Sequence, residues 1–73
     1  PNERERIAAW VRDRWLSAVG MKMYNMYVGT SDIVWGQGIE VEVGHDDTAR
    51  WFEDNRVVLE KAVGRTFKVR VKP

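Results

Sequence analysis

The segment Ile39–Val43 reads Ile-Glu-Val-Glu-Val, a strict alternation of aliphatic and acidic residues. Successive side chains of a β-strand point to opposite faces, so this pattern predicts a strand with one buried face and one wet face. Residues 33–35 and the Gly36-Gln37-Gly38 turn come before it and complete a predicted β-hairpin. Residues 66–71 predict a last strand whose inward side chains are Phe67, Val69 and Val71.

Two helical patterns precede the hairpin. Asn2 and Glu5 form a capping box that opens a helix, which runs to about Val19 and is closed by Gly20. A rotation of about 100° per residue then gives this helix one buried face. The predicted members of that face are Ile7, Ala8, Val11, Trp15, Ala18 and Val19. Residues 21–28 predict a second, shorter helix that ends at Gly29.

A long amphipathic pattern lies between the hairpin and the last strand. The turn at residues 44–47 supplies an N-cap aspartate, and one continuous helix is predicted from about Asp47 to Val63, where Gly64 stops it. Val57 falls on the charged side of this helix. The predicted buried face consists of Thr48, Trp51, Phe52, Val58, Leu59, Ala62 and Val63.

The element order is therefore ααββαβ, which predicts an α+β fold. A strand, a helix and another strand usually form a right-handed crossover, and helices must then cover one face of a three-stranded sheet. At 73 residues the chain makes a single domain, residues 1–73. Because the chain starts at Pro1 without a methionine, we expect it to be a fragment of a longer protein.

Composition argues against several function classes. With 12 Lys+Arg and 11 Asp+Glu, the net charge of +1 gives no global attraction to nucleic acid. The chain has no cysteine and a single histidine, His45, and it has no nucleophile–base set or phosphate-binding loop, so we expect no enzyme, no cofactor and no metal. It also lacks a signal peptide and an apolar run of the ~18 residues that span a bilayer. We therefore expect no membrane partner and a cytoplasmic location.

The layout resembles the KH-like N-terminal domain of the bacterial replication initiator DnaA and related phage and plasmid replication proteins. Tyr24, Tyr27 and Val28 stand where the family has an aromatic residue, a tryptophan three residues later and then an aliphatic residue in its second helix. The alternation of residues 39–43 matches the second strand of the family hairpin. The family's aromatic near the start of the third helix matches Trp51 or Phe52.

The resemblance implies a protein-interaction module that serves DNA replication initiation or helicase loading. Its partners would be a replicative helicase or a replication regulatory protein, with weak homodimerisation and weak contact to single-stranded DNA in some members. Apolar side chains left over after the core is filled would bind the partner. The candidates are Trp10, Met23, Tyr27 and Val57, whereas Tyr24 is expected in the core. For Trp10 an alternative stays open, in which it is half-buried against the short helix.

A second hypothesis is a KH-like domain that binds single-stranded DNA or RNA through a basic edge formed by Arg65, Lys68, Arg70 and Lys72. Two observations weigh against it. The chain has no Gly-x-x-Gly loop, which RNA-binding KH domains use to hold the backbone. Moreover, if the second and third strands are neighbours, Lys68 and Arg70 lie on the same sheet face as Glu40 and Glu42 and can form cross-strand ion pairs.

Overall fold

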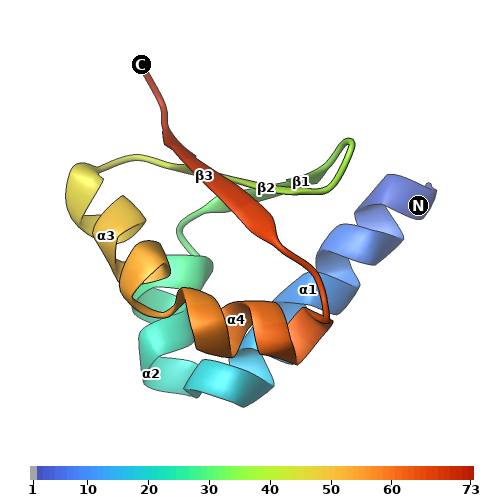
Figure 1. Cartoon of the computed structure of the whole chain (residues 1–73), viewed down its shortest axis with the longest axis horizontal. Helices are drawn as coiled ribbons and strands as arrows, with labels where there is room; N and C mark the ends of the chain where they lie inside the picture. Colours follow the sequence, from blue (N-terminus) through green and yellow to red (C-terminus); the bar gives the residue numbers. More distant parts are fainter. Residues whose placement is uncertain (1) are drawn as a thin grey trace.

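The computed structural model describes residues 2–73, and Pro1, from which we expect a longer parent chain, lies outside the described residues. Helices gather on one side of a small sheet (Figure 1). In chain order the elements are α1 (Glu3–Val19), α2 (Met21–Met23), the π-helix η1 (Tyr24–Val28), β1 (Asp32–Trp35), β2 (Ile39–Val43), α3 (Asp46–Asp54), α4 (Arg56–Val63) and β3 (Phe67–Val71). The predicted α+β class with a three-stranded sheet is confirmed.

The sheet is mixed and has the order β1-β2-β3. β1 and β2 form the predicted antiparallel hairpin, in which Ile33 pairs with Val41. β3 returns parallel to β2 after the helical crossover, so that Val41 pairs with Val69. This register places the aliphatic residues of β2 and β3 on the face toward the helices and their charged residues on the opposite face, where Val34 of β1 also lies.

Aromatic rings fill the space between the sheet and the helices. Trp15 of α1 is fully buried, and its ring centroid lies 5.7 Å from that of Phe52 and 5.4 Å from that of Phe67. The indole Nε1–H of Trp15 donates to the carbonyl oxygen of Leu59 in α4 at 2.9 Å. The core also contains these aliphatic residues: Val11, Val28, Ile33, Ile39, Val41, Val43, Leu59 and Val63.

The prediction of one continuous helix from Asp47 to Val63 is wrong, because the helix is interrupted at Asn55. This residue has φ −107° and ψ 14°, and its side-chain amide donates to the carbonyl oxygen of Trp51 at 2.8 Å. The backbone N–H of Asn55 donates to the same carbonyl oxygen at 3.1 Å, so α3 closes its last turn at this residue. The break yields two short helices, which bring Phe52 from α3 and Leu59 from α4 into the same core.

Other local predictions are also corrected. The N-cap of α3 is His45, which makes no side-chain capping bond, rather than an aspartate. Val58 is 48% exposed because it lies about 100° around α4 from Leu59, which faces the core. Ala18 is exposed in the final turn of α1, at the end far from the sheet (Figure 1). Val71 shares the inner face with Val69 but is 38% exposed at the end of β3.

The second helical segment begins and ends where the sequence predicts, but its last five residues are a π-helix. The Gly29 N–H donates to the carbonyl oxygen of Tyr24, five residues earlier, at 2.7 Å. Arg12 of α1 donates to the carbonyl oxygens of Val28 at 3.2 Å and Ser31 at 2.9 Å, just where the π-helix ends. This role of Arg12 was not predicted from the sequence. Its guanidinium thus joins α1 to the turn that follows η1.

Replacing Trp15 tests the role of the central aromatic cluster. We expect Trp15→Phe to lower the free energy of unfolding by about 1–3 kcal/mol, because it removes ring volume and the hydrogen bond to Leu59. Trp10→Phe is the matched control, since Trp10 is 45% exposed and should change stability by less than about 0.5 kcal/mol. Urea denaturation followed by circular dichroism measures both. Equal effects of the two substitutions would contradict the central position of Trp15.

Candidate interaction surface

The outer face of the sheet carries charges that pair with one another. Glu42 of β2 lies opposite Arg70 of β3, and the Nε of Arg70 donates to a carboxylate oxygen of Glu42 at 2.7 Å. Lys72 forms an ion pair with Asp32 of β1. The hydrogen bond from Lys72 lowers the pKa of Asp32, and the same bond raises the pKa of Lys72. Acidic groups of β1 and β2 are therefore paired with basic groups of β3 and Lys72 across this face.

This pairing bears on the basic residues of the nucleic-acid hypothesis. Arg70 and Lys72 form ion pairs with Glu42 and Asp32. Lys68 lies directly across from Glu40 in the strand register. The guanidinium of Arg65 lies 5.1 Å from the ring centroid of Trp35. Cross-strand pairing is thus present for Arg70, and the four basic residues do not form an unopposed positive strip. Nucleic-acid binding through these residues remains an untested prediction.

The helical layer carries most of the exposed large apolar side chains. By relative exposure these are Trp10 45%, Met21 61%, Met23 38%, Met26 50%, Val57 80% and Val58 48%, whereas only Val34 and Val71 are comparable among the strands of residues 2–73. The predicted candidates Trp10, Met23 and Val57 are all in this exposed set. Sequence analysis missed Met21, Met26 and Val58. The signal for the first two was available as three methionines within six residues, a composition suited to adaptable binding surfaces.

Trp10 lies on the flank of α1 that also carries Arg14, one turn later. Arg14 donates to the carbonyl oxygen of Ala62 at 3.0 Å, so this flank adjoins α4. Arg12, which reaches η1, is about 200° around the helix from Trp10. Trp10 therefore lies toward α4 and away from the short helix against which an alternative interpretation placed it.

Tyr27 is half-buried, because its ring stacks on that of Trp51 in α3 with centroids 4.7 Å apart and planes 12° apart. Met23 precedes it by one helical turn, on the same side of the segment. Tyr24 is also half-buried and packs against the core, as expected. Trp51, which sequence analysis assigns only to the core, is half-buried too. The stacked pair Tyr27–Trp51 thus stays partly exposed on the flank that carries Met23.

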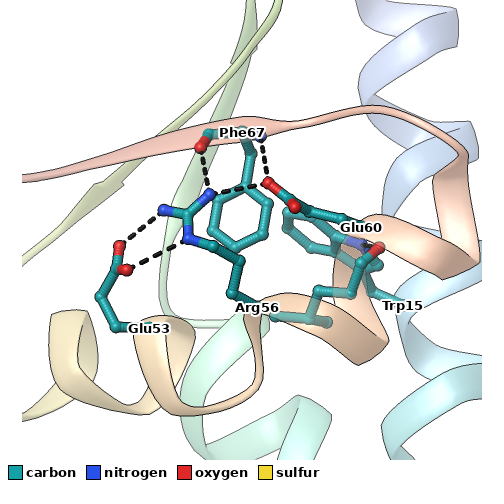
Figure 2. Close-up of polar contacts among 6 residues, drawn as sticks. Trp15, Glu53, Arg56, Glu60 and Phe67 are labelled. Atoms are coloured by element: carbon teal, nitrogen blue, oxygen red, sulfur yellow. Dashed lines mark hydrogen bonds and ion pairs between the residues drawn. The ribbon is translucent and has the colours of Figure 1, made fainter.

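A polar cluster holds the start of β3 against α4 (Figure 2). Arg56 forms a two-pronged ion pair with Glu53, with distances of 2.6 and 3.1 Å, and a further one with Glu60 at 2.8 Å. It also donates to the carbonyl oxygen of Phe67 at 2.6 Å, while its guanidinium carbon lies 4.2 Å from the Phe67 ring centroid. The hydrogen bond from Arg56 lowers the pKa of Glu53, and Glu53 with Glu60 raises the pKa of Arg56. This cluster therefore links α3, α4 and the start of β3 to one another.

The geometry holds few features of a small-molecule site. A hollow of about 360 Å³ opens where the hairpin turn meets the start of β3, and it is lined by Gln37, Gly38, Ile39, Glu40, Thr66, Phe67 and Lys68. Within residues 2–73, no three His, Cys, Asp or Glu side chains gather in a way that could hold a metal ion. His45 is exposed at the N-terminus of α3. In the same part of the chain, no helix is long and apolar enough to cross a membrane.

The Glu53–Arg56 pair predicts a specific pH dependence. Because the folded state lowers the pKa of Glu53 below its ordinary 4.5, the stabilisation is present above pH 4.5 and is lost as the pH falls through the lowered value. We therefore expect Glu53→Gln to be less stable than the wild type at pH 7, and the difference to shrink at pH 3. Denaturation at several pH values measures this. Asp54→Asn is the control, since Asp54 makes no ion pair within residues 2–73, and an identical pH profile for both variants would contradict the prediction.

The structure thus brings Met23 and Tyr27 together with Trp51 on one flank, and it places Trp10 on another side of the same helical layer. Val57 is the most exposed of the predicted residues, on α4. No protein-family model, curated protein or solved structure matches this chain.

Proposed function

We propose that this domain is a non-enzymatic protein-interaction module that docks a partner through the apolar side chains of its helical layer. The observation that carries the proposal is the unequal distribution of exposed apolar groups. Large apolar side chains are exposed on α1, α2, η1 and α4, while the outer face of the sheet carries the ion pairs Arg70–Glu42 and Lys72–Asp32 and exposes Val34. A folded chain that leaves several large apolar groups exposed on one layer commonly uses them for association.

The chemistry of these side chains suits a protein partner. Tryptophan and tyrosine are enriched among residues that dominate binding energy, and Trp10 and Tyr27 each keep part of their ring accessible. Methionine adapts its shape to an apolar surface because its side chain is unbranched and flexible. Met21, Met23 and Met26 supply this property on one segment. The total area is small, so the affinity is expected to be weak.

The replication context of the proposal comes from the resemblance to the DnaA N-terminal domain. The sequence of two helical segments, a hairpin, a helical crossover and a last strand in a mixed three-stranded sheet supports it, as does the position of Tyr24, Tyr27 and Val28 in the second helical segment. On this proposal the partner is a replicative helicase or a replication regulatory protein of the cytoplasm. The domain would recruit it while other parts of a longer chain bind DNA.

Titration of the ¹⁵N-labelled domain with a replicative helicase tests this function. We expect amide shifts around Trp10, Met23 and Tyr27, and a loss of at least about fivefold in affinity for Trp10→Ala, since truncating an aromatic anchor typically costs more than 1 kcal/mol. Val34→Ala is the matched control, because Val34 is similarly exposed (44%) but lies on the sheet. Absence of shifts at millimolar helicase would refute the replication partner, and equal losses for both variants would refute the helical surface.

A further inference from the structure

β3 is an edge strand, and its ladder leaves alternate backbone groups facing outward. The Lys72 N–H donates to the carbonyl oxygen of Val43 at 2.8 Å, which fixes the phase of the parallel ladder. In such a ladder every second residue directs both its N–H and its C=O to the neighbour. Lys68, Arg70 and Lys72 therefore face β2 with their backbone groups, and Phe67, Val69 and Val71 face away from the sheet.

At Phe67 the outward groups are already occupied. A carboxylate oxygen of Glu60 accepts from the Phe67 N–H at 3.3 Å, and Arg56 donates to the Phe67 carbonyl oxygen at 2.6 Å (Figure 2). Side chains of α4 thus act as the missing strand at the beginning of β3. These side chains make no such bond to the described residues beyond Phe67. The outward N–H and C=O groups of Val69 and Val71 have no hydrogen-bond partner among residues 2–73.

Helices pack beside both edge strands of the sheet, α1 against β1 and α3 against β3. The end of β3 is open, since Val71 is 38% exposed although its side chain belongs to the inner face. Figure 1 shows β3 continuing past the helices toward the C-terminus. An open strand end with unpaired backbone groups is a template for another strand.

We infer that the free edge of β3 at Val69 and Val71 accepts an extended peptide of alternating aliphatic and acidic residues as a fourth strand. β2 is the model for this ligand, because its Ile-Glu-Val-Glu-Val sequence already lies beside β3 with Glu40 and Glu42 opposite Lys68 and Arg70. A similar strand on the free side would place each of these cations between two carboxylates. Its aliphatic residues would cover Val69 and Val71. This site is separate from the helical surface and does not depend on the proposed function.

Charge selects this ligand over a second copy of the chain. The outer-face side chains of β3 are the cations Lys68 and Arg70, and Lys72 follows directly after the strand. Pairing β3 with the β3 of another copy would set like charges opposite one another, which destabilises a sheet. An acidic strand instead makes favourable cross-strand pairs. Strand addition of this kind takes its affinity from main-chain hydrogen bonds and its specificity from alternate side chains.

Peptide titration tests the inference directly. The probe is a capped Ile-Glu-Val-Glu-Val peptide, and the matched control is Ile-Lys-Val-Lys-Val, each added to the ¹⁵N-labelled domain up to several millimolar. We expect only the acidic peptide to bind, with shifts centred on β3 and with hydrogen exchange of the Val69 and Val71 amides slowed at least threefold at the highest concentration. No binding, equal binding of both peptides, or shifts confined to the helices would overturn the inference.

A backbone variant isolates the edge hydrogen bonds. Val71→Pro removes an outward N–H while leaving the bonds to β2 made by Arg70 and Lys72, so the fold should persist, as circular dichroism will show. We expect it to weaken acidic-peptide binding at least fivefold, whereas Met23→Ala, on the helical surface, should leave that binding unchanged. Unchanged peptide affinity in a folded Val71→Pro domain overturns the inference. So does slowing of the Val69 and Val71 amides by raised protein concentration alone, since a second copy would then occupy the edge.

Discussion

The burial of Trp15 is the interaction on which the other contacts depend. Its indole N–H reaches the Leu59 carbonyl oxygen, and its ring meets those of Phe52 and Phe67, so one side chain of α1 contacts α3, α4 and β3. A small domain buries only a modest share of its surface, and each large ring therefore contributes a considerable part of the stabilisation. The crossover helices can close over the parallel pair β2–β3 because this ring fills the space beneath them.

Strand pattern and helix limits were predictable because they depend on local rules. The alternation in β2 yields one inner face, and Gly20 and Gly64, with φ of 86° and 68°, end helices in conformations that favour glycine. The break at Asn55 was not predicted, because the hydrophobic periodicity continues across it. An asparagine in a helical pattern is a weak signal by itself, although its side chain can bond the preceding turn, as it does here at Trp51.

The candidate surface was predicted in part, and the reasons differ by residue. Trp10 and Val57 lie off the apolar stripe of their helices, so rotation alone identified them as exposed. Tyr27 lies in a π-helix and stacks on a residue from a distant segment, Trp51, which no local pattern reveals. The cluster around Arg56 escaped prediction for the same reason, since its backbone acceptor belongs to Phe67, beyond the end of α4.

Arg12 has a consequence for recognition. It joins the end of η1 to the helix that carries Trp10, and the hydroxyl groups of Thr30 and Ser31 bond the carbonyl oxygens of Met26 and Tyr27 from the following turn. The methionine-bearing segment is therefore held in one orientation before any partner arrives. A preorganised epitope loses less conformational entropy when it binds, which offsets a limited contact area. The backbone of this segment is thus fixed, while the methionine side chains that it carries stay flexible.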